Sequence, residues 1–308
     1  MPGVSSEPDD EFSLLAGNAE EYGLAWAGRP AVRRTSLALS GGGTLSAVVW
    51  GDDPAEAVFV HGSAQNAHTW DTVALALGRP LVAVDLPGHG HSSWRADHRY
   101  SPAVLAGALA EAVAALAPAA RLVVGMSLGG LASLALAAAH PELVPSLVLV
   151  DITPGVDGGK TRAITDFVSG PERFGSFEEI LERTVRHNPG RSEASLRRGV
   201  LHNAQRLPDG SWSWRWDPHR GRHPSEVEAD AEAGHGFASL WEDLGATRMP
   251  LTLVRGSRSP VVDDADLAEL RSRRPDARVV TLDGAGHSVQ GDCPLELAAL
   301  LAPLLPHP

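Results

Sequence analysis

The sequence predicts an α/β fold in which a mostly parallel sheet carries helices on both faces and a helical cap is inserted. Three observations predict it. Short runs rich in Val and Leu recur along the chain and are apolar on both faces, as buried parallel strands are. Helical patterns separate most of these runs, as in strands joined by crossover helices. Residues 151–250 contain no such run and are therefore predicted to be an insertion.

The first two predicted strands form a hairpin. The runs 34–39 and 44–50 flank the three glycines at 41–43, and glycine permits the positive φ of a tight hairpin. The apolar runs that follow are predicted to be buried strands: 57–60, 81–84, 122–125, 147–150, 251–254 and 278–281. Apolar residues at helical spacing predict helices at 69–77, 103–117, 128–139, 264–272 and 294–304.

The long stretch without a buried strand defines the predicted domain organisation. Residues 1–30 form a lead-in, residues 31–154 and 246–308 form the core, and residues 155–245 form the cap. No change of composition marks a linker on either side of the cap. We expect the cap to lie over the carboxyl edge of the sheet.

The cap is predicted to be helical and to end in an aromatic segment. Helical patterns cover 176–187 and 192–205. After them, Trp212, Trp214 and Trp216 alternate with other residues, and this period of two places their indoles on one face of an extended segment. These side chains either pack the cap onto the core or contact a substrate.

Charge and hydropathy exclude several classes of partner. The 308 residues carry a formal net charge of -12, with 38 acidic against 26 basic residues, whereas nucleic acid requires a basic surface. No apolar run reaches the ~18 residues of a membrane span, and residues 1–12 lack a basic and apolar signal segment. We therefore expect a cytoplasmic protein with no nucleic-acid or membrane partner.

A serine between a predicted strand and a predicted helix is the first candidate for chemistry. The sequence Gly125-Met126-Ser127-Leu128-Gly129 matches G-x-S-x-G and joins the strand 122–125 to the helix 128–139. A nucleophile elbow requires this context, in which the serine hydroxyl is exposed at the edge of the sheet. The glycines allow a tight turn and a close approach of helix to strand. The alternative is a serine that only caps the helix.

Two more loops belong to the same predicted edge. His61-Gly62-Ser63 follows the strand 57–60, and the amides of Ser63 and Leu128 are predicted to bind an oxyanion. Gly284-Ala285-Gly286-His287 follows the last predicted strand. Because imidazole titrates near neutral pH, His287 is the candidate general base. An ordinary turn and a surface histidine are the alternatives.

Together these motifs resemble those of the α/β-hydrolase family over about residues 33–304. The matching segments are 61–63, 85–92 (AspLeuProGlyHisGlyHisSer), 125–130 and 284–287, and the nucleophile precedes the histidine as in the family. The resemblance implies a Ser–His–acid triad that needs no metal or organic cofactor.

The acid is where the chain departs from the family pattern. Pro260 stands in the loop after the strand 251–254, where many members have an aspartate. Some bacterial esterases that the chain resembles carry the acid after the strand that follows the nucleophile helix, which implies Asp151. Asp263 and Asp264 are the alternatives, although an aspartate at the start of a helix is a common cap.

The resemblance implies a serine hydrolase that cleaves a small or medium carboxylic ester, a lactone or a thioester through an acyl-enzyme. The alternatives are C–C bond hydrolysis of a diketone-like ring-cleavage product, cofactor-free haloperoxidase or perhydrolase chemistry, and ligand binding without turnover. A serine at the elbow argues against haloalkane dehalogenases and epoxide hydrolases, whose nucleophile is an aspartate. The candidate substrate-binding residues are Trp70, His202, Asn203, Trp214 and Trp241.

Histidine patterns elsewhere do not predict a metal site. His89 and His91 lie near Asp85, and His219 and His223 are four residues apart in a segment that is a poor helix. Spacing alone does not build a metal site. We therefore expect a small-molecule substrate and no metal.

Overall fold

The central sheet of the computed structural model has eight strands among the residues described, which are 10–219, 237 and 239–305. The strands are β1 (Val32–Ala38), β2 (Thr44–Trp50), β3 (Ala57–Val60), β4 (Leu81–Asp85), β5 (Leu122–Met126), β6 (Leu147–Val150), β10 (Leu251–Gly256) and β11 (Arg278–Leu282). Their order across the sheet is β1-β2-β4-β3-β5-β6-β10-β11. The antiparallel pairs are β1 with β2 and β2 with β4, and the other neighbours are parallel. The predicted α/β class is confirmed.

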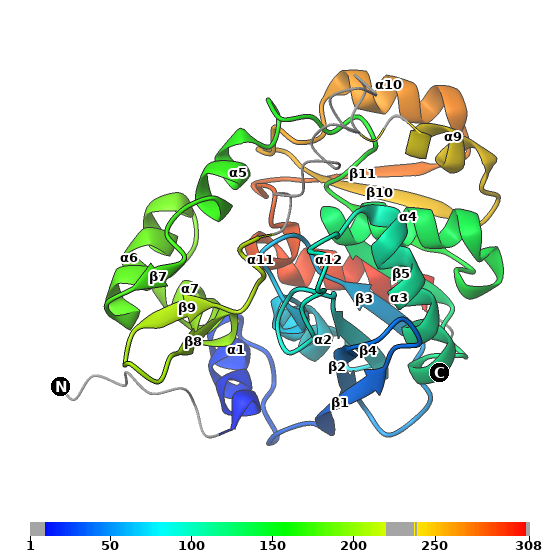
Figure 1. Cartoon of the computed structure of the whole chain (residues 1–308). Helices are drawn as coiled ribbons and strands as arrows, with labels where there is room; N and C mark the ends of the chain where they lie inside the picture. The colour runs from blue at the N-terminus through cyan, green and yellow to red at the C-terminus, as the bar shows by residue number, and fades with distance from the viewer. Residues whose placement is uncertain (1–9, 220–236, 238, 306–308) are drawn as a thin grey trace.

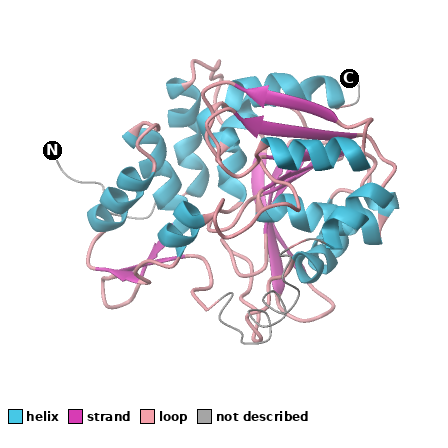
Figure 2. Ribbon diagram, turned by 90° about the horizontal axis from the view of Figure 1, so that it is seen from above, coloured by secondary structure: helices cyan, strands magenta, loops and turns pink. Residues whose placement is uncertain are grey.

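Helices cover both faces of the sheet, as Figure 2 shows from above. On one face, α3 (Pro102–Leu116) and α4 (Leu128–Ala139) pack together, with α9 (Ser239–Ala246) and α10 (Asp264–Arg273) beside them. On the other face lie α1 (Leu15–Glu21), α2 (Asp71–Leu77), α11 (Val289–Asp292) and α12 (Pro294–Leu301).

Each face of the sheet has its own hydrophobic core. Leu109 of α3, Leu134 of α4 and Leu149 of β6 belong to one buried cluster. Phe59 of β3 and Leu297 of α12 belong to the other. Because the central strands carry apolar side chains on both faces, the same strands contribute side chains to both clusters.

Local signals explain where several helices begin. Ser101 caps α3 by accepting a hydrogen bond from the Val104 amide. Pro102 occupies the first helical position, where a backbone N–H would have no intrahelical acceptor, so its absence in proline costs nothing. Asp263 and Asp266 form a reciprocal capping box at the start of α10. The predicted helices at 103–117 and 264–272 match α3 and α10 closely.

The inserted segment contains helices and a small sheet. Its helices are α5 (Arg162–Val168), α6 (Phe177–His187) and α7 (Glu193–Asn203), and the last two match the predicted patterns. Its strands are β7 (Arg173–Phe174), β8 (Ala204–Arg206) and β9 (Trp212–Trp214), in the order β7-β9-β8. The insertion is therefore not wholly helical, because the alternating tryptophan segment pairs with a strand on each side. Figure 1 shows these elements together at the left, beside α1.

The tryptophans of this segment pack within the insertion. Trp212 contacts Phe177 edge-to-face, while Trp214 and Trp216 stack with ring centroids 4.3 Å apart. All three are buried. All three side chains therefore have a packing role. Their contacts lie mainly within the insertion, and the cluster they form reaches the core at Ala64.

Two segments differ from the simple division into lead-in, core and cap. Helix α9 lies in the stretch predicted to be cap, yet Leu240 and Leu244 join the core cluster beside α4. In the lead-in, the short 3-10 helix Glu11–Leu14 and α1 bury Phe12 and Leu15 in the other cluster. Among the described residues, no helix is long and apolar enough to cross a membrane.

Candidate active site

Ser127 occupies a sharp turn between β5 and α4. Its backbone has φ 51° and ψ -122°, a conformation that costs energy for any residue with a Cβ. Neighbouring glycines make the turn possible. A Cβ at Gly125 would lie 2.6 Å from the carbonyl oxygen of Gly129, and a Cβ at Gly129 would overlap the carbonyl oxygen of His61. The turn has the geometry of a nucleophile elbow.

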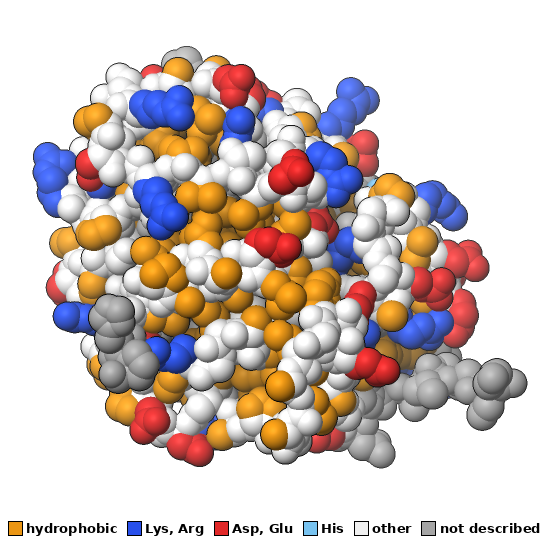
Figure 3. All heavy atoms as spheres, turned by 180° about the vertical axis from the view of Figure 1, so that it is seen from behind, with side chains coloured by type: hydrophobic (Ala, Val, Ile, Leu, Met, Phe, Trp, Pro, Cys, Tyr) orange, Lys and Arg blue, Asp and Glu red, His pale blue; other side chains and the backbone are white. Residues whose placement is uncertain are grey.

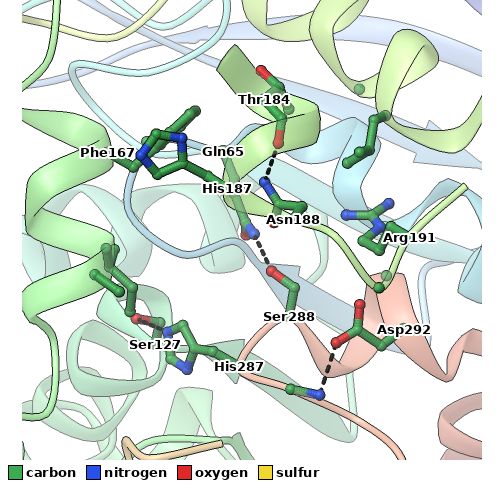
Figure 4. A pocket seen from close by; sticks show the side chains of 18 of the residues that line it. Gln65, Ser127, Phe167, Thr184, His187, Asn188, Arg191, His287, Ser288 and Asp292 are labelled. Atoms are coloured by element: carbon green, nitrogen blue, oxygen red, sulfur yellow. Dashed lines mark hydrogen bonds between the residues drawn. The ribbon is translucent and has the colours of Figure 1, made fainter. Parts of the chain in front are cut away.

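A chain of hydrogen bonds leads from this serine into the protein. The Oγ of Ser127 lies 3.1 Å from Nε2 of His287, and Nδ1 of His287 lies 2.7 Å from Oδ2 of Asp151. The side chain of Asp151 is fully buried, whereas that of His287 is partly exposed. Figure 4 shows Ser127 and His287 facing each other at the cavity. This arrangement suits proton transfer from the hydroxyl to the imidazole.

The last residue of β10 and the loop after it hydrogen-bond to the carboxylate of Asp151. Its Oδ1 accepts a hydrogen bond of 2.9 Å from the Gly256 amide, and its Oδ2 accepts one from the Ser259 hydroxyl. Gly256 has no room for a side chain, because a Cβ would overlap the carbonyl oxygen of Gly286. These donors compensate a buried carboxylate. Sequence reasoning missed Ser259, although it immediately precedes Pro260, the residue that marks the departure from the family pattern.

The two alternative acids have other partners. Asp263 caps α10, and its carboxylate lies 3.0 Å from Lys160 Nζ. The side chain of Asp264 is 93% exposed and pairs with Arg255 at 3.1 Å. Neither carboxylate is hydrogen-bonded to His287, whose Nδ1 is occupied by Asp151.

Of the two residues whose amides are predicted to bind an oxyanion, Leu128 follows Ser127 in the chain and Ser63 lines the same cavity. Leu128 is the first residue of α4, so its N–H is one of the amides that a helix leaves without an intrahelical acceptor. Ser63 follows Gly62, where an added Cβ would lie 3.0 Å from Cβ of Ser127. The Gly62 amide donates to Oε1 of Gln65, which ties this loop down. Gln65 is another residue that sequence reasoning missed.

A cavity of about 620 Å³ opens over Ser127 and His287. Loops of the core form its floor, and the insertion supplies much of its wall. The apolar lining includes Ile164, Phe167, Val168, Trp214 and Trp216. The predicted substrate-binding residues Asn203 and Trp214 both line this cavity.

The other three predicted substrate-binding residues lie elsewhere. Trp70 is fully buried in the core and contacts Phe59 edge-to-face at 5.0 Å. Trp241 belongs to the core cluster beside α4. His202 is buried and stacks on His68, outside the cavity lining. A position in the sequence near the end of a strand does not determine whether a side chain points into the cavity or into the core.

His68 and His202 belong to a buried charged cluster between the core and α7. Nδ1 of His68 lies 2.9 Å from Asp71, and Nε2 lies 3.0 Å from Glu11. Burial lowers the pKa of His68, but these two carboxylates outweigh it and raise that pKa to about 9. Burial and the neighbouring His68 hold the pKa of His202 well below its usual value. The cluster therefore contains one charged and one neutral imidazole near neutral pH.

The same cluster is a poor metal site. Potential ligand atoms of His68, Asp71 and His202 lie within 4.8 Å of one another. The two imidazole rings, however, stack at 3.7 Å with an angle of 10°, so their lone pairs lie in parallel planes and do not converge on one ion.

Of the two histidine patterns noted in the sequence, only the one around Asp85 lies wholly within the described residues. Asp85 is paired with Arg34 at 2.7 Å and also accepts from the amides of Ala67 and His91. His223 lies outside the described residues.

Comparisons with known proteins agree with this geometry. A family model described as alpha/beta hydrolase fold matches residues 58–294. Esterase Rv0045c of Mycobacterium tuberculosis is 44% identical over 303 residues, which cover 96% of each chain. A crystal structure of that esterase aligns over 99% of each chain, with 42% identity and a TM-score of 0.81. Pimeloyl-[acyl-carrier protein] methyl ester esterase of Aeromonas hydrophila is 30% identical, covering 80% of this chain and 92% of its own. The chain therefore belongs to the α/β hydrolase family.

Proposed function

We propose that this protein hydrolyses small-molecule carboxylic esters through an acyl-enzyme on Ser127. The observation that carries the proposal is the hydrogen-bond chain from Ser127 through His287 to Asp151 beneath an open cavity. The names of the similar proteins add support, since one is an esterase with 44% identity and another is a methyl ester esterase with 30% identity.

The proposed reaction has two halves. In acylation, Oγ of Ser127 attacks the ester carbonyl carbon while Nε2 of His287 takes the hydroxyl proton. The amides of Ser63 and Leu128 donate to the oxyanion of the tetrahedral intermediate. His287 then gives the proton to the departing alcohol. In deacylation, His287 takes a proton from water as the water oxygen attacks the acyl carbonyl carbon. His287 then returns the proton to Oγ of Ser127 as the bond to Oγ breaks and the carboxylic acid leaves.

Asp151 has an orienting role in this proposal. Its carboxylate accepts the Nδ1 proton of His287, which leaves Nε2 unprotonated and directed at Ser127. The same charge stabilises the imidazolium that forms during each half-reaction. The donors from Gly256 and Ser259 keep the carboxylate in place.

Ester hydrolysis is favoured over the other reactions of the same side chains. Both proteins named above are esterases, which favours esters over C–C bond hydrolysis and perhydrolysis. Ligand binding without turnover would leave the pairing of Ser127 with His287 without a use.

The experiment measures hydrolysis of p-nitrophenyl esters from acetate to decanoate by the wild type and by Ser127→Ala. We expect the variant to lose at least about 10⁴-fold in kcat/KM, because no other hydroxyl replaces the nucleophile. The chain-length optimum then gives the size of acyl group that the cavity accepts. Full turnover by Ser127→Ala would contradict the proposal.

Aspartate variants separate the candidate acids in the same assay. Asp151→Asn should lower kcat by about 10³- to 10⁴-fold, because an amide favours the wrong tautomer of His287. Asp264→Asn is the matched control, since that exposed carboxylate pairs with Arg255, and it should change kcat less than twofold. The reverse result would assign the acid to Asp264.

A further inference from the structure

The charges that line the cavity differ from those of the whole chain. The chain carries a net charge of -12, yet the described residues lining the cavity include three permanent cations and a single carboxylate. The cations are Lys160, Arg191 and Arg258, and the carboxylate is Asp292. The cavity lining thus carries more cations than carboxylates, and the partners that each cation already has decide which of them can bind an anionic ligand.

Two of these cations are already engaged. Nζ of Lys160 lies 3.0 Å from Asp263 and 2.7 Å from Asp266, so carboxylates of the protein neutralise it. Arg258 donates to the carbonyl oxygen of Gly284 on an exposed loop. Asp292 is engaged as well, because its Oδ2 accepts a hydrogen bond of 2.8 Å from the Gly286 amide.

Arg191 is different. It stands in the turn between α6 and α7, and its Nη2 donates to the Ser195 hydroxyl at 2.7 Å. Its Nε is buried without a hydrogen-bond partner. No carboxylate of the described residues forms an ion pair with it. A buried guanidinium donor with no acceptor costs free energy, which an incoming acceptor recovers.

The surroundings of Arg191 leave space for its guanidinium beside the reacting groups. Its Nη1 would lie 2.7 Å from a Cβ at Gly291, so the guanidinium packs directly against the backbone of α11 at that glycine. Gly291 is four residues after His287. Figure 4 shows Arg191 across the cavity from Ser127, with Gln65 and Ser288 between them. Arg191 and Ser127 therefore line the same cavity, at separate places.

We infer that Arg191 binds a carboxylate at the far end of the substrate, so that the preferred substrates are esters that carry a second, ionised carboxyl group. The inference rests on the proposed esterase function and adds its substrate class. The planar guanidinium matches a carboxylate with two parallel hydrogen bonds. Gln65 and Ser288, which lie between Ser127 and Arg191, line the path of the chain that separates the carboxylate from the ester.

The test compares two substrates that differ only in charge: mono-4-nitrophenyl adipate and its neutral counterpart, 4-nitrophenyl methyl adipate. The measured quantity is the ratio of their kcat/KM values, corrected for spontaneous hydrolysis. We expect the wild type to prefer the anionic ester. Arg191→Met should lower the ratio about 10- to 100-fold, the effect of one lost charge-assisted pair. A smaller folded fraction would lower both values equally and cancel in the ratio.

Two further variants sharpen the result. Arg186→Met removes an exposed arginine of α6 that does not line the cavity, and it should leave the ratio within twofold of the wild type. Arg191→Lys keeps the charge but not the paired donors, so its ratio should fall between those of the wild type and Arg191→Met.

The outcomes are distinct. A ratio unchanged in Arg191→Met, or a wild type that prefers the neutral ester, would overturn the inference and leave the esterase proposal intact. A wild type that hydrolyses neither ester would overturn the esterase proposal itself. Competitive inhibition by adipate gives an independent readout, because its inhibition constant should rise in Arg191→Met by a factor similar to the loss in the ratio.

Discussion

At the scale of single residues, small side chains determine where Ser127 can stand. The serine has a positive φ, and the backbone of α4 approaches β5 so closely that Gly125 and Gly129 have no space for a Cβ. Asp151 also has a positive φ, immediately after β6. Ser127 and Asp151, at the two ends of the hydrogen-bond chain, thus both have strained backbone conformations. The packing around them must stabilise these conformations.

Gly129→Ala should damage both stability and activity. The new methyl group would overlap the carbonyl oxygens of Val60 and His61, so β3 and α4 must move apart. We expect the free energy of unfolding in urea to fall by about 2 kcal/mol or more, the usual result of overpacking, with a loss of ester hydrolysis.

Gly107→Ala is the matched control. Gly107 lies in α3, is exposed, and has nothing near an added Cβ. Alanine there should raise the free energy of unfolding by about 0.5–1 kcal/mol, because it reduces the entropy of the unfolded chain. Equal effects of the two substitutions would contradict the role assigned to the close contact.

At the scale of elements, the cluster around His68 joins four parts of the chain. Glu11 comes from the lead-in, Arg34 from β1, Asp71 from α2 and His202 from α7. Arg34 also lies 3.1 Å from His68 and opposes its protonation, but the two carboxylates outweigh it. The charge of His68 thus joins Glu11 of the lead-in to Asp71 of α2, while its ring stacks on His202 of α7.

This cluster predicts a stability that depends on pH. The pKa of His68 rises from 6.5 when unfolded to about 9 when folded. Its contribution is therefore complete below pH 6.5 and is lost as the pH rises through 9. At 1.36 kcal/mol for each pKa unit, the loss between pH 6.5 and 9.5 is about 3 kcal/mol.

Unfolding in urea at the two pH values measures this contribution. His68→Gln lacks the titrating group, so its free energy of unfolding should decrease less than that of the wild type between pH 6.5 and 9.5, by about 3 kcal/mol. Other groups that titrate in this range are common to both proteins and cancel in the comparison. Equal decreases would show that His68 is not charged in the folded protein.

At the scale of the whole molecule, the lead-in fastens the insertion to the core. Helix α1 packs on α2, and Arg198 of α7 donates to Asn18 at 2.6 Å and pairs with Glu21. Tyr22 donates to the carbonyl oxygen of Gly291, close to His287. Segments 170 or more residues apart in sequence therefore meet beside the cavity.

A double-mutant cycle tests this attachment. Arg198→Ala and Glu21→Ala should each lower the free energy of unfolding, and the double variant should lower it by about 1 kcal/mol less than their sum. The side chains are only 14% and 22% exposed, so the coupling should exceed that of a fully exposed pair. Strict additivity would mean that the ion pair contributes nothing to stability.

The outer surface contrasts with the cavity. On the face drawn in Figure 3, acidic and basic side chains are interspersed around a central area of hydrophobic side chains. The excess of cations over carboxylates in the cavity lining is therefore a local feature. Its three cations come from separate segments: Lys160 before α5, Arg191 between α6 and α7, and Arg258 after β10.

The order and type of nearly all the core elements could be predicted from local patterns, because strands buried on both faces and capped helices each leave a pattern in the sequence. It also predicted the elbow, since G-x-S-x-G between a strand and a helix is a local signal. The small sheet of the insertion was predicted only in part: the alternating tryptophans indicated the extended segment of β9, whereas β7 and β8, of two and three residues, carry too little pattern.

Which distant side chains meet could not be predicted, because it depends on how separate segments pack in three dimensions. Asp151, Asp263 and Asp264 were all candidates from the sequence, and the packing of β6 beside β10 brought Asp151 alone against His287. Likewise, Trp70 and Trp241 are buried in the hydrophobic cores. Arg191 lines the cavity, although it belongs to no sequence motif. The physical reason is that periodicity predicts whether a side chain is buried, whereas its neighbours depend on how separate segments pack.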